Sequence, residues 1–297
     1  MIHSVLAGGS LIISSAAAKH GLFLALKDAI VAAMPTTNLL NALALCSLIP
    51  AAAIPLRQGA GRDGPFWAAL LLAISGPAAW SVHLLWGAWQ TGLGTSLWVS
   101  IAASALLFAL VAARTETGWR LAPLLMPYLL ALGFLASAVK GEARPLSGAA
   151  PDVWLDLHIV TAVLTYALLT LAAVASLAVF LQERALKHKR PTRLTRMLPA
   201  VLQSETLAGR LLVLSEVVLG CGLASGMATQ FLETGHLLHF DHKTLLSIIA
   251  FVLIGALLTG HRVCGVRGRL AARVVLVAYL LLTLAYPGVK FVTQVVY

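Results

Sequence analysis

Charged side chains are scarce in this chain. Asp, Glu, Lys and Arg make up 11% of its 297 residues, while 60% of the residues are apolar and the mean hydropathy is +0.91. A soluble domain carries about 25% charged residues, because its surface must be covered with polar groups. The composition therefore excludes a soluble enzyme, a disordered chain and a nucleic-acid-binding domain, and it predicts a protein whose main solvent is lipid.

Cysteines and catalytic motifs are scarce as well. The three cysteines, Cys46, Cys221 and Cys264, form no CxxC, no CxxCH haem-attachment motif and no zinc-binding spacing, so we interpret them as small apolar residues. The sequence has no Walker loop, no GxSxG or HExxH motif and no paired carboxylates for acid–base catalysis. We therefore expect a protein that is not an enzyme.

Long uncharged runs occupy most of the sequence. Residues 64–113 carry no Asp, Glu, Lys or Arg, and a membrane-crossing helix needs only about 20 residues, so we expect the turn-forming segment 90–95 to split this run into two spans. The same reasoning predicts an all-α, polytopic bundle of transmembrane helices over 37–297. Eight spans are expected, near 37–56, 66–89, 95–113, 120–139, 157–182, 209–231, 243–260 and 271–291.

The positive charges lie in the gaps between the predicted spans, which explains the net charge of +10 without nucleic acid. Of the 21 Lys and Arg residues, 15 fall on one side of the bundle, and the side rich in Lys and Arg faces the cytoplasm. We therefore predict a basic cytoplasmic loop at 183–208 and both termini outside. The arginines of this loop contact anionic membrane lipid or dock a partner protein.

Residues 1–36 are interpreted as an N-terminal extension. The first 33 residues are mildly apolar but include Lys19, Lys27 and Asp28, and they begin without the basic segment of a signal peptide. Three interpretations stay open: an outer amphipathic segment, an additional weak helix, or a true start of translation at Met34.

Ionisable side chains within the spans indicate functional positions, because lipid burial makes them costly. His83 lies in the second span, six residues inside its outer end, and His158 lies at the outer mouth of the fifth. Each imidazole could bond a neighbouring helix, but neutral imidazole is also the usual axial ligand of haem iron. We predict that both bind haem b near the outer face, with Trp80, Trp86 and Tyr166 lining the ring.

Three further polar features need an explanation. His261, at the inner end of the seventh span, is either an interfacial histidine beside Arg262 or part of a second, inner site. Glu216 in the sixth span is expected to snorkel to the interface or to pair with a cation such as His261. The outer loop 232–243 carries histidines three residues apart, which suits a metal, but we favour a lip over the outer histidine pair.

An ordered set of motifs in the second half resembles the cytochrome c assembly family of membrane haem-handling proteins, and within it the YpjD/HemX-like branch. The resemblance covers about 37–297. The residues that carry it are Trp154 and His158 with Tyr166, the run Asp241-His242-Lys243-Thr244-Leu-Leu-Ser247, the pair Gly260-His261, the turn Gly265-Val-Arg267-Gly268-Arg269, and Ala285-Tyr286-Pro-Gly288.

The resemblance implies a multi-pass protein of the bacterial inner membrane that binds or presents haem through helix histidines. His158 matches the family's first external ligand histidine, His261 matches its membrane-embedded histidine, and His83 is a looser match. The chain departs from the family in two places. The tryptophan-rich outer loop is reduced to residues 240–243, and no histidine follows Gly288.

These departures leave the external histidine pair incomplete, so the second ligand is expected to be His83 or His242. The resemblance also implies partners, either cytochrome c maturation components or a cation-export membrane protein. The alternative function is a cofactor-free accessory subunit of a membrane assembly or of a divalent-cation export system.

Overall fold

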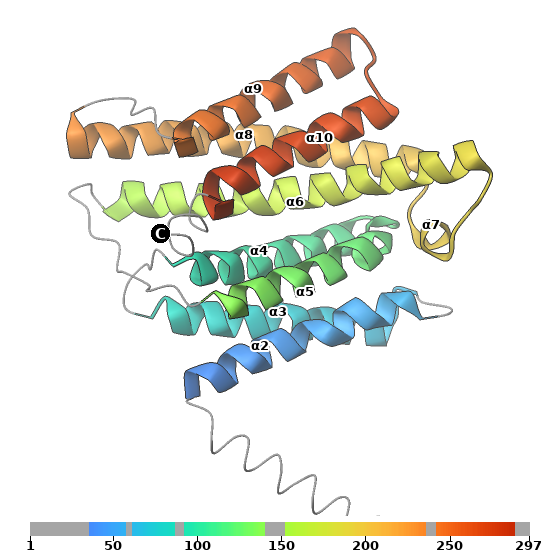
Figure 1. Cartoon of the computed structure of the whole chain (residues 1–297), viewed down its shortest axis with the longest axis horizontal. Helices are drawn as coiled ribbons and strands as arrows, with labels where there is room; N and C mark the ends of the chain where they lie inside the picture. The colour runs from blue at the N-terminus through green and yellow to red at the C-terminus, as the bar shows by residue number, and fades with distance from the viewer. Residues whose placement is uncertain (1–35, 58–60, 87–91, 140–151, 236–241, 289–297) are drawn as a thin grey trace, which may run out of the picture. The chain divides into compact units, whose positions relative to one another are not determined.

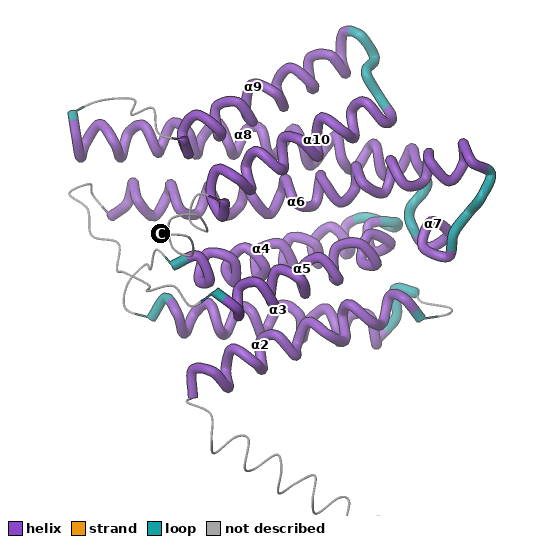
Figure 2. Tube along the Cα trace, viewed as in Figure 1, coloured by secondary structure: helices purple, strands orange, loops and turns teal. Residues whose placement is uncertain are grey.

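All regular secondary structure in the described part of the chain is helical. The structure is a computed structural model that describes residues 36–57, 61–86, 92–139, 152–235 and 242–288. Figure 2 shows helices and loops in these ranges and no strand. The chain divides into two units, 1–43 and 44–297. In the first unit the described residues, 36–43, are helical. The N-terminal extension as a whole lies outside the described residues.

The helices follow the apolar runs of the sequence. In chain order they are α2 (Thr36–Ala53), η1 (Ile54–Leu56), α3 (Gly64–Leu84), α4 (Leu93–Arg114), η2 (Gly118–Leu121), α5 (Ala122–Ala138), α6 (Asp152–His188), α7 (Arg193–Met197), α8 (Val201–Thr234), α9 (His242–Val263), α10 (Gly268–Thr283) and the π-helical turn η3 (Leu284–Gly288). The separate helices α3 and α4 confirm the predicted split of the long uncharged run, but α4 begins at Leu93, within the predicted turn 90–95.

Seven helical segments in the described ranges are long and apolar enough to cross a membrane, and they match the first seven predicted spans. The eighth predicted span overlaps α10, which has 16 residues and continues into η3. A crossing helix needs about 20 residues, so α10 alone is short for a span. The count of eight spans and the outer position of both termini stay predictions.

The predicted cytoplasmic loop 183–208 is shorter in the structure. Helix α6 continues to His188, and α8 begins at Val201. The connection contains the short helix α7, and Gln182 of α6 fastens it by donating to the carbonyl oxygens of Thr195 at 2.8 Å and Pro199 at 3.1 Å. Leu, Ala, Lys and Arg favour helices, so a helix in this sequence has no reason to stop where the hydrocarbon ends.

Helix α6 is the centre of the second unit. It packs against α8 over most of its length and also against α10 and α4, as Figure 1 shows. The membrane-crossing window of α6 is 78% buried, compared with 17% for that of α9. The central part of α6 is therefore surrounded by protein, whereas α9 lies at the periphery.

Candidate functional site

His158, in the second turn of α6, packs against two small residues of α8. A Cβ added at Gly226 would come within 2.9 Å of the imidazole Cε1, so glycine makes room for the ring. The ring nitrogen Nδ1 lies 3.1 Å from the carbonyl oxygen of Gly222 and 3.3 Å from the hydroxyl of Ser225. Thr161, one turn further along α6, lies over Gly222. Gly222 and Gly226, four residues apart on α8, thus allow α6 and α8 to pack closely.

These hydrogen bonds define which nitrogen of His158 is available. A carbonyl oxygen can only accept, so the Nδ1–H of His158 donates to Gly222, and Nε2 of the neutral ring keeps its lone pair. None of the described residues forms a hydrogen bond with Nε2. Metal-ligating histidines usually donate their other ring N–H to a backbone carbonyl or carboxylate. The Nδ1–H bond of His158 is therefore of the kind that metal-ligating histidines make.

His83 lies at the end of α3, which corrects its expected depth. The second span was expected to reach residue 89, but α3 ends at Leu84, shortly before Gly87, a poor helix former. His83 therefore occupies the last turn and is exposed. Its ring stacks on Trp80, with centroids 5.4 Å apart and planes at 23°. Trp80 is buried, and Trp86 is 82% exposed.

The described structure does not bring His83 and His158 together. The main partner of α3 is α4, whereas α6 packs mainly against α8 and α10. All hydrogen bonds recorded for the His158 ring come from α8. Haem ligation by the two histidines stays a prediction from the sequence, without a contact between them in the described ranges.

Tyr166 belongs to a cluster of hydroxyl groups that joins α5, α6 and α10. Its oxygen lies 3.2 Å from that of Tyr279 and 3.5 Å from that of Tyr128. Tyr128 and Tyr279 are hydrogen-bonded to each other, and Thr170 donates to Tyr279 at 3.2 Å. The 5% exposed side chain of Tyr166 thus has these hydroxyl groups as partners; its role beside a haem ring stays a prediction. The sequence pattern did not identify Tyr128 and Tyr279 as hydrogen-bond partners of Tyr166.

His242 is the first residue of α9, and its side chain is exposed. The other two histidines of the predicted outer lip, His236 and His239, lie outside the described residues. Within the described ranges no group of three or more His, Cys, Asp or Glu side chains could hold a metal ion. The role of His242 as an alternative haem ligand stays a prediction.

His261 lies two residues before the end of α9, in a tight connection to α10. Its Nδ1 is 2.8 Å from the carbonyl oxygen of Val266, so Nδ1–H is the donor and Nε2 keeps its lone pair. No described residue hydrogen-bonds that Nε2. His261 therefore has the same arrangement as His158, with one nitrogen fixed by a backbone carbonyl and the other available.

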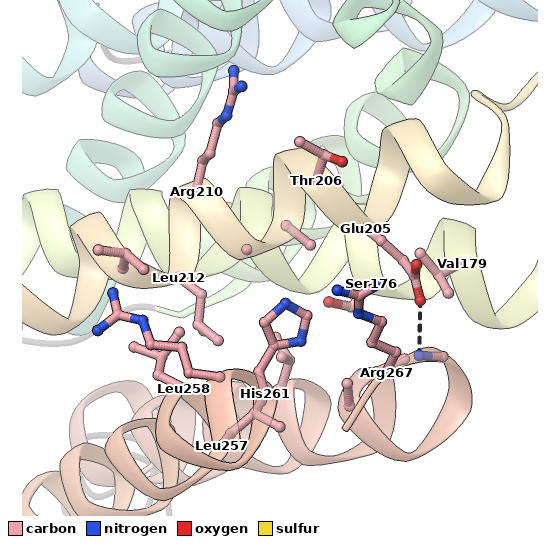
Figure 3. A pocket seen from close by; sticks show the side chains of 18 of the residues that line it. Ser176, Val179, Glu205, Thr206, Arg210, Leu212, Leu257, Leu258, His261 and Arg267 are labelled. Atoms are coloured by element: carbon pink, nitrogen blue, oxygen red, sulfur yellow. Dashed lines mark hydrogen bonds between the residues drawn. The ribbon is translucent and has the colours of Figure 1, made fainter. Parts of the chain in front are cut away.

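The imidazole of His261 faces a cavity of about 660 Å³, which we name the inner pocket. Figure 3 shows the ring directed from α9 towards α8, with Arg267 beside it and Arg210 directed away from it. Side chains from four helices and one turn line the inner pocket. The lining residues are Ser176 and Val179 of α6, several residues of α8 between Leu202 and Leu214, several of α9 between Leu257 and Arg262, Arg267 of the turn, and several of α10 between Gly268 and Val275.

Two carboxylates fasten the turn between α9 and α10 against the neighbouring helices. Glu205 of α8 accepts the backbone N–H of Gly268 at 2.8 Å. Glu183 of α6 forms an ion pair with Arg269 at 3.3 Å, and the Arg269 guanidinium also donates to the Glu183 carbonyl oxygen at 3.0 Å. The turn itself depends on Gly265 and Gly268, which both have a φ of +66°, a conformation that favours glycine.

Glu216 differs from its expected role. The sequence predicts that it snorkels or pairs with a cation, but its Oε2 is buried and has no hydrogen-bond partner among the described residues. Its other oxygen, Oε1, lies against Gly255 of α9, 3.1 Å from where a Cβ would stand. Glu216 does not line the inner pocket, and within the described residues the hydrogen bond of the His261 ring goes to Val266 and not to Glu216. The pairing with His261 is therefore wrong.

The family described as "Cytochrome C assembly protein" matches residues 69–297, which includes His83, His158 and the whole inner pocket. A protein of Azospirillum brasilense, described as "Uncharacterized 28.8 kDa protein in nifR3-like 5'region", is 58% identical over 258 residues that cover 85% of this chain and 95% of that protein. No solved structure matches. The chain belongs to the cytochrome c assembly protein family.

Proposed function

We propose that this chain holds haem within a bacterial inner membrane for cytochrome c assembly, with the inner pocket as the binding site and His261 as an axial ligand. The observation that carries the proposal is the available Nε2 of His261 at a mainly apolar cavity of about 660 Å³. Small-molecule sites usually measure about 300–1,000 Å³, with apolar walls and a few polar groups that fix orientation. The family membership supports haem as the ligand.

The residues of the inner pocket fit the chemistry of haem. The hydrogen bond from Nδ1–H of His261 to Val266 fixes the ring and leaves the nitrogen that iron prefers. Leu212 and Leu257 line the apolar part of the cavity, and Arg267 lines the end near the turn. An apolar ring would lie against the leucines, and its carboxylates would bind guanidinium groups. When bound, haem supplies an iron centre whose axial ligands set its potential.

His158 supports a second haem-ligand position near the outer face. It is held like His261, by a backbone carbonyl at Nδ1, and its Nε2 is available. Its partner ligand, His83 or His242, is proposed from the sequence. Haem b is proposed because the chain contains no CxxCH motif for covalent attachment. The proposed partners are membrane lipid and cytochrome c maturation components.

The test is an absorption spectrum of the detergent-purified protein, oxidised and dithionite-reduced, with a pyridine haemochrome measurement of haem per chain. We expect near-stoichiometric haem in the wild type and loss of most of it in His261→Ala. The control is His188→Ala, because His188 is an exposed histidine at the end of α6 that does not line the pocket. Unchanged spectra and haem content in His261→Ala would contradict the proposed site.

The alternative is a cofactor-free accessory subunit of a membrane assembly or of a cation-export system. It predicts a colourless protein that stays colourless after haem is added. The basic connection between α6 and α8 would then be the surface that docks the partner, because it concentrates Lys and Arg.

A further inference from the structure

The polarity of the inner pocket changes along its length. On α8 the lining runs from Leu202, Glu205 and Thr206 through Arg210 to Leu212–Leu214; on α9 it runs from Arg262 back to Leu257. On the α10 side it runs from Arg267 to Val275. Eight helical residues rise about 12 Å. Over about that length, the polarity of the lining changes in the same direction on all three segments. The charged residues Glu205, Arg262 and Arg267 lie at the turn end of the pocket. Towards the helix centres the lining is mainly apolar, and its one arginine, Arg210, is directed away from the His261 ring (Figure 3), which matches an amphiphile with an anionic head.

Two positive charges at the polar end have no partner in the described protein. Arg269, outside the pocket lining, is paired with Glu183, and one oxygen of Glu205 accepts a backbone N–H. Arg262 and Arg267 line the pocket and form no ion pair with any described carboxylate. Unpaired guanidinium groups beside an apolar wall favour a phosphate or carboxylate ligand.

The apolar side of the pocket is accessible from the lipid. Two lining residues at the apolar end of the pocket are exposed, Leu214 by 55% and Val213 by 37%. These side chains lie on α8, which is long and apolar enough to cross a membrane. The charge count predicts that the turn lies on the cytoplasmic side, which would put the arginines at the level of the inner-leaflet headgroups.

We propose that the inner pocket binds an anionic phospholipid, with its phosphate at Arg262 and Arg267 and an acyl chain along Leu212 and Leu257. Basic pockets between transmembrane helices on the cytoplasmic side are suited to anionic headgroups. The lipid and the proposed haem would occupy the same space, so they would exclude each other. The mutual exclusion rests on the proposed function, whereas the lipid site is independent of it.

The experiment is native mass spectrometry of the full-length, detergent-purified protein titrated with phosphatidylglycerol or phosphatidylcholine. We expect the wild type to retain phosphatidylglycerol preferentially. Arg262→Gln with Arg267→Gln removes both positive charges at the proposed headgroup position, so it should weaken retention about tenfold or more. The control is Arg184→Gln with Arg190→Gln, two exposed arginines on the same predicted side that do not line the pocket. Equal retention in both double variants overturns the proposal.

Two further measurements keep the outcomes separate. The charge-preserving pair Arg262→Lys with Arg267→Lys should restore most of the retention, which a folding defect would not. His261→Ala should lose haem but keep phosphatidylglycerol. Wild-type protein in nanodiscs of phosphatidylcholine should bind haem more tightly than in nanodiscs that also contain phosphatidylglycerol. If haem binds equally in both, the shared pocket is wrong. If no haem binds in either, the proposed function fails while the lipid titration still stands.

Discussion

At the residue scale, the room for the His158 ring comes from the missing side chain of Gly226. A methyl group there would stand 2.9 Å from Cε1, and inserted groups in packed interiors cost about 1–3 kcal/mol. We predict that Gly226→Ala lowers the melting temperature in detergent and displaces the ring from Gly222. The control is Gly209→Ala on the same helix, where a Cβ meets nothing within 4 Å. That variant should be neutral or slightly stabilising, because alanine favours helices. Equal melting temperatures for the two variants would refute the packing argument.

The tyrosine cluster gives a second test at this scale. Tyr279 bonds Tyr128 and Tyr166 and accepts from Thr170, so Tyr279→Phe removes several hydrogen bonds at once. Each is worth about 1 kcal/mol or less within a membrane. We expect Tyr128→Phe and Tyr279→Phe each to reduce stability and the double variant to cost less than the sum, because the two share one bond. Strictly additive unfolding free energies would show that the shared bond contributes nothing.

At the scale of elements, the turn between α9 and α10 tests how the pocket is held. Gly265 and Gly268 have the same positive φ, but only at Gly268 would a Cβ meet Glu183, at 2.7 Å from Oε1. Alanine at either position strains the backbone by about 1 kcal/mol. Alanine at 268 also displaces the carboxylate that pairs with Arg269. We expect trypsin to cleave the turn faster in Gly268→Ala than in Gly265→Ala. Equal cleavage would mean that Glu183 does not fasten the turn.

The helices show what a sequence can predict at this scale. The break between α3 and α4 follows from length, since 50 uncharged residues exceed one membrane crossing. Helix ends are harder to predict, because the hydrocarbon thickness limits a span but not a helix. Helix α6 continues into the polar region to His188, whereas α3 ends early at Leu84. The early end of α3 puts His83 in its last turn. The start of α6 at Asp152, instead of near residue 157, puts His158 in the second turn of that helix.

At the scale of the whole chain, the candidate site depends on residues far apart in sequence. His261 and the glycine turn are visible locally, because a histidine ending an apolar run and a Gly-rich basic segment are both unusual. Their partners are not visible: Glu205 lies 63 residues from Gly268, and Glu183 lies 86 from Arg269. In the sequence, Glu183 and Glu205 look like ordinary solvent-exposed residues near the ends of helices. Only the packing of α6 and α8 against α9 and α10 turns these residues into one pocket.

The orientation of the chain decides from which side a ligand reaches that pocket. The side that holds 15 of the 21 Lys and Arg residues is predicted to be cytoplasmic, and it includes Cys264, an exposed cysteine next to the turn. In a Cys46→Ser, Cys221→Ser background, a membrane-impermeant maleimide should label Cys264 only after spheroplasts of the expressing bacterium are permeabilised. Lys243→Cys with Cys264→Ser, at the exposed opposite end of α9, should be labelled without permeabilisation. The reverse pattern would put the pocket at the outer face, where the basic residues would no longer meet inner-leaflet lipid and a cytoplasmic supply of haem would be excluded.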